Sequence, residues 1–497
     1  MKKHPLYPIL FALFPVLSLT AYNIREIFIG EVFRPLLFSL LLSVAIYGLV
    51  NLRIRNASRA ALISVLLLFL FFSYGQMYSA FEGREVFGIG LFRHRVLFPL
   101  FVVLGCLAVF WVVRAVGRAD SFTYPLNVVS MFLLIYPSFT ITSTLVQQSI
   151  ADAASRNADV VSGSDPNAAR PDVYYIILDG YGRRDVLQRE FGFDNSEFIE
   201  GLQARGFYVA ECSQSNYAHT LYSLSSSLNY DYLDSLDVSN DAERIALLKH
   251  GSVGSAFETL GYKVVAFPTG WNMTEWTDAD IYTDYGRTFT TLTEFETLFL
   301  NTTLLRVWTD YDRLTSQTIP YSNARRLRVL SMIEALQVLP SMEGNYFVFA
   351  HFVIPHPPYS FGANGEWLEI NMGSASYEQI SQAYISQTIY INREILKIID
   401  TIRAESDTPP VIILQGDHGP PPDLTNDPEI RMPILNAYFL PGGNPALDLY
   451  PAISPVNSFR VVLNRYYGVN LPLLEDKSYF SPNQDHERVG LVPNSCP

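Results

Sequence analysis

Acidic and histidine side chains follow short apolar runs at three places in the second half of the chain. Asp179 comes directly after VYYIIL, and the pair Asp417 and His418 comes directly after VIILQG. His351 ends the run YFVFAH, and His356 follows five residues later in HFVIPHPPY. Taken singly, an Asp before Gly often only makes a turn, and a His-Pro-Pro stretch often only shapes a loop. Taken together, these residues have the chemistry of a site for a divalent metal ion.

The residue types narrow the choice of metal. Carboxylate oxygens combined with imidazole nitrogens suit Zn or Mn, whereas sites made only of oxygen suit Mg or Ca. We therefore expect one divalent ion at these strand ends, with Zn or Mn favoured.

A hydroxyl nucleophile is expected near the same place. The segment Ser213–Asn229 reads SQSNYAHTLYSLSSSLN, and a helix is expected to begin near His219 and Thr220. The Thr220 hydroxyl would then lie by the helix N-terminus, where free N–H groups and the helix dipole favour an anion. A metal-activated hydroxyl there can attack phosphorus or sulfur. The alternative is that Thr220 only caps the helix, and that the following serines form a small packing face.

Alternating strands and helices must position these residues. A short run made only of apolar residues is typical of a strand buried on both faces, as in a parallel sheet. The expected strands are Val173–Leu178, Lys263–Phe267, Tyr346–His351, Val411–Gln415 and Ile434–Leu440. The expected helices are Asp241–His250, Ser255–Leu260, Asn323–Leu339, Ser376–Ala404 and Asn457–Tyr467. This order predicts an α/β domain with a mostly parallel central sheet flanked by helices, whose ligands collect at the carboxyl ends of the strands.

The first part of the chain has a different character. Its apolar runs are Pro5–Tyr22, Pro35–Leu52, Ala60–Tyr78, Leu97–Val116 and Tyr124–Val146. A helix of about 20 residues rises about 1.5 Å per residue and so crosses a hydrocarbon core of about 30 Å. Five such runs in the first 150 residues leave no polar faces for water, which argues against soluble core helices. The prediction is an α-helical membrane domain of five transmembrane helices at residues 1–147.

Loop charges predict the orientation of this membrane domain. With a cytoplasmic N-terminus, the inner segments carry seven Lys and Arg residues and the outer loops carry five. The positive-inside rule then favours a multi-pass protein of the cell membrane with its C-terminal domain outside the cytoplasm. The middles of the spans carry no acidic residue or lysine, so we interpret this domain as an anchor and not as a transporter.

The remaining chain divides by composition and charge. Residues 148–171 are small, polar and unpatterned and are expected to be a linker, which leaves residues 172–497 as the extracytoplasmic domain. Residues 1–150 hold 12 of the 35 basic residues and five of the 48 acidic ones, so the rest has 20 more acidic than basic residues. That excess argues against a nucleic-acid partner. Cys212 and Cys496 could pair, but two cysteines make no framework, and we expect them to be unpaired.

The order of motifs resembles a known superfamily. PDVYYIILDG, then a threonine followed by xxS at the head of a helix, then a late GDHG resembles the alkaline phosphatase/sulfatase superfamily. Five spans followed by an outer domain resemble its membrane-anchored, sulfatase-like branch, the lipoteichoic acid synthases and phosphoethanolamine transferases. The resemblance implies that Asp179, Thr220, Asp417 and His418 bind the metal and that Thr220 is the nucleophile. It also implies that His351 and His356 contact the phosphoryl group or the leaving group.

Departures from that pattern limit the chemistry. The motif C/S-x-P/A-x-R, which sulfatases mature to formylglycine, is absent, which argues against sulfate-ester hydrolysis by that route. Asp310 and Asp312 are not accompanied by an Asp-x-x-x-His motif for a second metal, so one tightly held metal is favoured and the question of a second metal stays open.

The residues and the resemblance together imply a membrane-anchored, metal-dependent phosphotransferase. It would move a phospholipid-derived head group, phosphoethanolamine- or phosphoglycerol-like, from a membrane lipid donor to an envelope glycan or lipid through a phospho-threonine intermediate. A phosphodiesterase, phosphatase or sulfatase-like hydrolase of the same superfamily would use the same residues. An alternative of another class is a catalytically inactive envelope protein that binds a glycan or a partner. The identity of donor and acceptor, and the oligomeric state, stay open.

Overall fold

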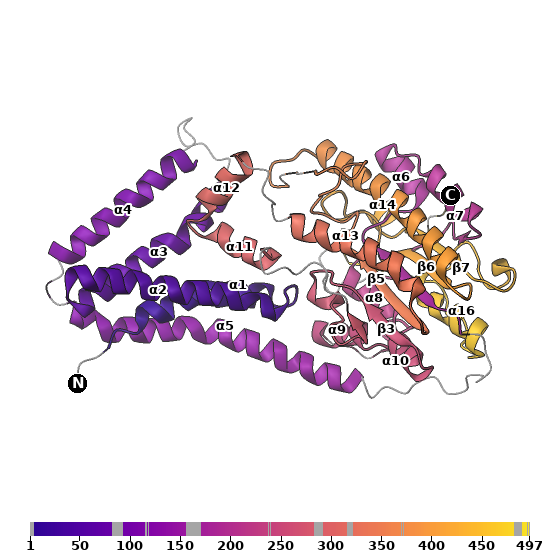
Figure 1. Ribbon diagram of the computed structural model, residues 1–497, viewed down its shortest axis with the longest axis horizontal. Helices are drawn as coiled ribbons and strands as arrows, with labels where there is room; N and C mark the ends of the chain where they lie inside the picture. Colours follow the sequence, from indigo (N-terminus) through magenta and orange to yellow (C-terminus); the bar gives the residue numbers. More distant parts are fainter. Residues whose placement is uncertain are drawn as a thin grey trace. The chain divides into compact units, whose positions relative to one another are not determined.

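The protein consists of two compact units (Figure 1). The computed structural model describes residues 4–81, 93–114, 117, 119–155, 170–236, 238, 240–282, 292–315, 322–368, 370, 372–481, 490–494 and 496. The helical unit comprises Met1–Val146 and Thr290–Tyr321. The α/β unit comprises Gln147–Phe289 and Ser322–Pro497.

The helical unit contains the five apolar helices that the sequence predicts. These are α1 (Tyr7–Asn23), α2 (Phe33–Ile54, preceded by the 3-10 turn η1, Ile29–Val32), α3 (Ala57–Phe81), α4 (His94–Arg114) and α5 (Asp120–Ser155). By length and composition, α2 to α5 are each long enough to cross a membrane, whereas α1 is apolar but has 17 residues. Five crossings and a cytoplasmic N-terminus stay predictions.

The boundaries between the units differ from the expected ones in two places. Helix α5 continues to Ser155, through residues that we expected to belong to the linker; residues 156–169 lie outside the described residues. In addition, α11 (Glu294–Thr302) and α12 (Arg306–Thr315) belong to the helical unit, although they lie far along the chain. Both helices are short, with 9 and 10 residues, far below the length of a membrane span, so the sequence gave no sign of this attachment.

A seven-stranded sheet forms the centre of the α/β unit. Its strands are β1 (Val173–Leu178), β2 (Tyr208–Val209), β3 (Lys263–Ala266), β4 (Ile281–Tyr282), β5 (Tyr346–Phe352), β6 (Val411–Gly416) and β7 (Asn436–Phe439). Their order across the sheet is β2-β7-β6-β1-β5-β3-β4. The strands from β6 to β4 pair in parallel, whereas β7 is antiparallel to both β6 and β2. This arrangement confirms the predicted fold class, and β2 and β4 are two strands too short for the sequence to indicate.

Helices cover both faces of this sheet (Figure 1). The described helices of the unit are α6 (Arg184–Phe191), α7 (Ser196–Ala204), α8 (Thr220–Ser227), α9 (Asp241–Lys249), α10 (Ser252–Thr259), α13 (Ser322–Val338), α14 (Tyr377–Glu405), α15 (Pro428–Arg431) and α16 (Pro455–Tyr467). The 3-10 turns are η2 (Asn272–Thr274), η3 (Leu339–Ser341) and η4 (Pro445–Leu447). Helices α7, α13 and α14 pack on one face, and α8, α9, α10 and α16 pack on the other.

Strand β1 shows why its sequence is apolar throughout. Successive side chains of a strand point to opposite faces, so Tyr174 and Ile176 enter one hydrophobic core while Tyr175 and Ile177 enter the other. All six residues of β1 are buried. Burial on both faces therefore fixes the position and register of β1 in the sheet, and with them the position of Asp179, which follows it.

The C-terminal tail is fastened to the α/β unit. Strands β8 (Ser478–Phe480) and β9 (Gly490–Val492) form a small antiparallel sheet. Cys212 and Cys496 form a disulfide bond, so the expectation that they are unpaired is wrong. Their separation of 284 residues in the chain is bridged only by the tertiary fold, which spacing in the sequence cannot reveal.

Candidate metal and nucleophile site

Three adjacent central strands bring the candidate residues to one edge of the sheet. Asp179 follows β1, and Asp417 and His418 follow its parallel neighbour β6, with Leu178 paired to Gly416. On the other side of β1, Leu178 pairs with Phe352 of β5, the strand that carries His351. Because all three strands are parallel, their carboxyl ends coincide.

The three residues after β1 and β6 form a compact cluster of possible metal ligands. One ligand atom from each of Asp179, Asp417 and His418 lies within 4.8 Å of the others. The His418 Nε2 atom is 3.6 Å from Asp179 Oδ1 and 3.5 Å from Asp417 Oδ2. All three side chains are buried. Distances of this size leave room for an ion between the atoms without requiring direct hydrogen bonds.

Unpaired oxygens indicate that this cluster fits a cation. Both carboxylate oxygens of Asp179, and Oδ2 of Asp417, are buried and have no hydrogen-bond partner among the described residues. Buried polar atoms are almost always paired, so three orphaned oxygens side by side require an explanation. His418 Nδ1 donates to the Gly419 carbonyl oxygen at 2.8 Å, which leaves the lone pair of Nε2 facing both carboxylates. One oxygen of each carboxylate and the His418 Nε2 atom are therefore available as ligands for a single metal ion.

The electrostatics of the cluster agree with that interpretation. Burial, followed by the charge of the neighbouring Asp417 carboxylate, raises the pKa of Asp179 to about 7. Burial also raises the pKa of Asp417, although His351, the Gly180 N–H and the Thr220 hydroxyl oppose the shift. Burial lowers the pKa of His418 well below its usual value. A divalent cation would remove the repulsion between the carboxylates and suits a neutral imidazole, and the mixed O and N donors suit Zn or Mn.

Thr220 lies at the start of a helix beside this cluster. Helix α8 begins at Thr220, and the Thr220 Oγ1 atom is 3.4 Å from His418 Nε2. The first turn is tied to the end of β6, because the Ser223 hydroxyl donates to the Asp417 carbonyl oxygen at 2.6 Å. Ser227, one turn further on, is 3.0 Å from the Tyr175 hydroxyl of β1. The serines therefore pack α8 against the sheet, as the alternative interpretation expected, and this packing places Thr220 by the cluster.

The two histidines after β5 lie in different surroundings. His351 is buried, and its Nε2 atom is 3.2 Å from Asp179 Oδ2. His356 keeps part of its surface accessible, and its backbone N–H donates to the Asp179 carbonyl oxygen at 3.1 Å. Desolvation lowers the pKa of each imidazole to about 4, so both are neutral at pH 7. His351 thus lies beside the Asp-Asp-His cluster, whereas the His356 side chain is partly accessible.

Two further residues near the histidines were not selected from the sequence. Trp271 packs edge to face against His356, with ring centres 5.0 Å apart, and the Arg325 guanidinium lies 5.4 Å from the Trp271 ring centre. Arg325 is buried, donates to the Pro357 carbonyl oxygen, and lowers the pKa of Asp179, His351 and His356 through its charge. Neither residue stands in a motif, so only the fold reveals them.

Arg431 and Arg183 have structural partners near the site. Arg431 is fully buried and donates to the carbonyl oxygens of Pro420 and Ala218. It therefore joins the segment after His418 to the segment before Thr220, and its charge also lies near Asp179 and Asp417. Arg183 pairs with Asp185 at 2.6 Å and donates to the Ser213 carbonyl oxygen.

Helix α14 braces the loops that carry the site. The Tyr384 hydroxyl donates to the Gly180 carbonyl oxygen at 2.8 Å and accepts from the Gly182 N–H. Gly180 has a φ of +74°, a backbone conformation that residues other than glycine rarely adopt. One turn later, the Gln387 side chain accepts from the Ser360 N–H and donates to the Pro355 carbonyl oxygen, which holds the loop around His356.

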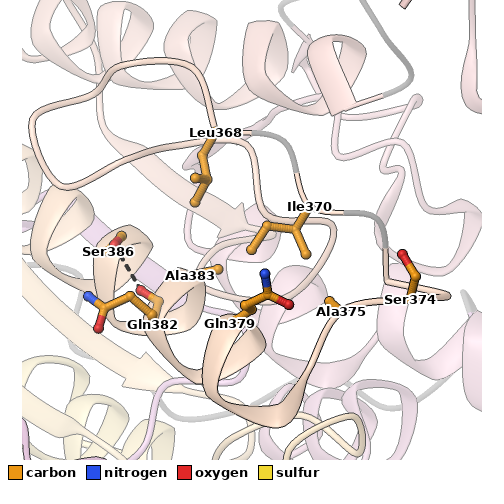
Figure 2. Close-up of a pocket in the computed structure, with 8 residues that line it drawn as sticks. All are labelled: Leu368, Ile370, Ser374, Ala375, Gln379, Gln382, Ala383 and Ser386. Carbon is orange, nitrogen blue, oxygen red and sulfur yellow. Dashed lines mark hydrogen bonds between the residues drawn. The ribbon is translucent and has the colours of Figure 1, made fainter.

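A separate hollow of about 400 Å³ lies at the beginning of α14 (Figure 2). Its described lining is neutral and comprises Leu368, Ile370, Ser374, Ala375, Gln379, Gln382, Ala383 and Ser386. The Ser386 hydroxyl donates within the helix to the Gln382 carbonyl oxygen. Since these side chains include neither a carboxylate nor an imidazole, this hollow does not have the chemistry of the strand-end cluster.

Comparison with known proteins finds similar solved structures. No protein-family model matches the chain, and no curated protein matches it either. One similar structure is the zinc complex of the C-terminal periplasmic domain of EcEptC from Escherichia coli: identity is 13%, coverage is 68% of this chain and 97% of that one, and the TM-score is 0.43. Another is the integral membrane protein lipooligosaccharide phosphoethanolamine transferase A from Neisseria meningitidis: identity is 11%, coverage is 93% of this chain and 95% of that one, and the TM-score is 0.40. A third is the periplasmic domain of phosphoethanolamine transferase EptC from Campylobacter jejuni, at 11% identity, 61% and 93% coverage and a TM-score of 0.39. The structures similar to this chain thus include phosphoethanolamine transferases of both layouts, periplasmic domain alone and full membrane protein.

Proposed function

We propose that the chain is a membrane-anchored, metal-dependent phosphotransferase that acts through a phospho-threonine intermediate. The observation that carries this proposal is the position of Thr220, at a helix N-terminus and 3.4 Å from the imidazole of a buried Asp-Asp-His cluster. A divalent cation held by Asp179, Asp417 and His418 would lower the pKa of the Thr220 hydroxyl and offset negative charge on the reacting phosphoryl group.

Thr220 is the proposed nucleophile. Its Oγ1 attacks phosphorus of the lipid head group, the new bond is Thr220 Oγ1–P, and the bond from phosphorus to the diacylglycerol oxygen breaks. Helix α8 begins at Thr220, and the dipole at a helix N-terminus favours the negative phosphoryl oxygens. Ser223, Tyr175 and Ser227 support the attack indirectly, because their hydrogen bonds fix α8 against β1 and β6.

Proton transfer is assigned to His356. Over the first half-reaction one proton moves from the Thr220 hydroxyl to the leaving lipid oxygen, and His356 is the accessible imidazole beside the cluster. The His356 Nδ1 atom is 2.7 Å from the Pro357 carbonyl oxygen and donates to it, which leaves Nε2 as the nitrogen that accepts and returns the proton. In the second half-reaction the acceptor oxygen forms a bond to phosphorus and the Thr220 Oγ1–P bond breaks, while the neutral ring takes the proton of the acceptor hydroxyl and passes it to the Thr220 oxygen. His351, buried against Asp179, positions that carboxylate.

The donor and acceptor classes follow from the layout of the chain. Four helices long and apolar enough to span a membrane precede the α/β unit, which supports a lipid donor and an acceptor in the cell envelope, either a glycan or a lipid. Water in place of that acceptor would make the same site a phosphodiesterase. A divalent ion, with Zn or Mn favoured, is the cofactor that this proposal requires.

Mass spectrometry of the intact, purified protein tests the nucleophile. The protein in lipid nanodiscs, with Zn or Mn and phosphatidylethanolamine or phosphatidylglycerol, should gain the mass of one phospho-head group, located on Thr220 by peptide fragmentation. Thr220→Ala should abolish the adduct, whereas Thr401→Ala, a half-buried threonine of α14 outside the site, should not. Turnover that persists in Thr220→Ala would refute the scheme. Head group released to water without any modified acceptor would establish the hydrolase instead.

A further inference from the structure

The chain of the α/β unit is interrupted by a segment that folds elsewhere. Residues 290–321 belong to the helical unit, and the described part of this segment forms α11 and α12. The segment is inserted between Trp271 and Arg325, two residues that lie by the candidate site, and only nine residues lie between Thr315, at the end of α12, and Arg325. The helical and α/β units are therefore joined by three chain connections, where the sequence alone suggested one linker.

Helix α11 packs closely against the first three membrane helices. Phe299 is buried, with ring centres 6.2 Å from those of both Phe38 in α2 and Phe72 in α3. The Leu304 N–H donates to the Phe71 carbonyl oxygen of α3 at 2.8 Å. Gly75 makes this contact possible, because a Cβ atom there would lie 2.1 Å from the Asn301 carbonyl oxygen. The attachment is thus a backbone-to-backbone approach and not a loose surface contact.

Helix α12 is held by a polar cluster at the end of the membrane helices. Asp310 Oδ2 is 2.9 Å from His94 Nε2, and His94 Nδ1 is 2.8 Å from the Tyr74 hydroxyl. Arg306 pairs with Asp310 at 3.1 Å, and its guanidinium lies 4.3 Å from the Tyr78 ring centre. Tyr74 and Tyr78 are in the last turns of α3, and His94 begins α4. Tyrosine, histidine and paired charges at helix ends are typical of the lipid–water boundary.

Large apolar side chains of the same segment remain exposed. Trp308 in α12 is 63% exposed, Leu298 in α11 is 38% exposed, and Leu292 just before α11 is 49% exposed. Phe33, at the start of α2, is likewise exposed. A short helix with arginine on one side and tryptophan on another is characteristic of segments that lie in a membrane interface.

We propose that α11 and α12 form an interfacial hairpin, whose exposed Trp308 and Leu298 lie in the head-group layer of the bilayer. The partner of the hairpin is a phospholipid surface. It lies at the end of the membrane helices where α3 ends and α4 begins. In the sequence, the hairpin lies between Trp271 and Arg325. The proposal does not depend on the proposed enzymatic function, since it concerns only where the hairpin lies.

Lipid-borne quenchers test the position of Trp308 directly. The full chain with Cys106→Ser and Trp308→Cys is labelled with an environment-sensitive fluorophore and reconstituted in nanodiscs that contain phospholipids with a nitroxide at the head group or upper acyl chain. Interfacial side chains lie about 5–10 Å into the head-group boundary, so quenching at position 308 should be several-fold stronger than at position 447 labelled through Leu447→Cys. Leu447 is the matched control because it is an 81% exposed leucine of the α/β unit. Equal quenching at both positions would overturn the proposal.

A glycine pair tests whether docking on α3 holds the hairpin there. Gly75→Val places a side chain against the Asn301 backbone and should markedly reduce quenching at position 308. Gly48→Val makes the same change in membrane helix α2, where nothing lies within 4 Å of the added Cβ, and should leave quenching unchanged. Unchanged quenching in Gly75→Val would contradict the docking. The quenching measured without either substitution decides the proposal even if Gly75→Val fails to fold.

Discussion

The buried carboxylate of Asp179 should make the metal-free protein sensitive to pH, and Asp179→Asn should reverse that sensitivity. Both oxygens of Asp179 lack a hydrogen-bond partner in the described structure, and its pKa is raised from 3.8 to about 7. A raised carboxylate pKa means that the folded state holds the proton more tightly than the unfolded state. The stability that this proton provides is complete below pH 4 and is lost as the pH rises through 7.

The size of this effect follows from the same values. At 1.36 kcal/mol per pH unit, ionisation of Asp179 destabilises the metal-free α/β unit by on the order of 4 kcal/mol at pH 8. Asp179→Asn removes that charge next to Asp417, so without metal the variant should melt higher than the wild type at pH 8, on the order of 5 °C higher. At pH 5 the difference should be much smaller. With Zn or Mn the order should invert, because the wild type binds the ion and the variant has lost a ligand.

Thermal unfolding of the full chain in detergent measures this, with a chelator or with metal, between pH 5 and pH 8. Asp407→Asn is the matched control, since Asp407 is an exposed aspartate away from the cluster and its replacement should change stability by less than about 0.5 kcal/mol. If Asp179→Asn lowers the melting temperature of the metal-free protein at pH 8 as much as it does with metal, Asp179 is not an uncompensated buried charge and the metal-site argument fails.

Three further outcomes are expected. The pKa of His356 is about 4, so its neutral form dominates above pH 5, and the rate of transfer to the acceptor should be constant from pH 6 to pH 8. A rate that falls below pH 6.5 would argue against His356 as the proton acceptor. His356→Gln should slow turnover by about 10²-fold or more. Ser223→Ala removes a buried hydrogen bond to the Asp417 carbonyl oxygen and should lower stability by about 1–2 kcal/mol and weaken metal affinity by equilibrium titration, whereas an unchanged affinity would show that α8 does not position the cluster. Cys496→Ser breaks the bond to Cys212 and should destabilise the α/β unit by about 2–4 kcal/mol in denaturant unfolding. An unchanged unfolding midpoint would contradict this prediction.

The sequence predicted the elements with strong local patterns. The all-apolar run of β1 was placed at its observed ends, and β3, β5, β6 and β7 appear within two residues of their expected ends. The five apolar helices were also expected, because about 20 uninterrupted apolar residues leave few other solutions. Strands β2 and β4 have two residues each, too few for a periodic pattern to develop.

The candidate site was predictable as a set of residues but not as a geometry. Asp179, Asp417 and His418 each follow a recognisable strand, so parallel pairing brings them together. The distinction between His351, against Asp179, and the more accessible His356 depends on how one loop turns after β5. Trp271 and Arg325 stand in no motif and reach the site only through tertiary packing.

The sequence by itself thus determined the membrane helices, the α/β sheet and the residue types at its strand ends, because hydrophobic periodicity and strand order are local properties of the chain. Only the tertiary structure decided that Thr220 lies beside the Asp-Asp-His cluster, that Cys212 and Cys496 are bonded, and that α11 and α12 fold onto the membrane helices. Each of these is a contact between segments far apart in the chain. Such contacts depend on which buried surfaces fit one another, as Gly75 fits the backbone of α11, and no local pattern encodes that fit.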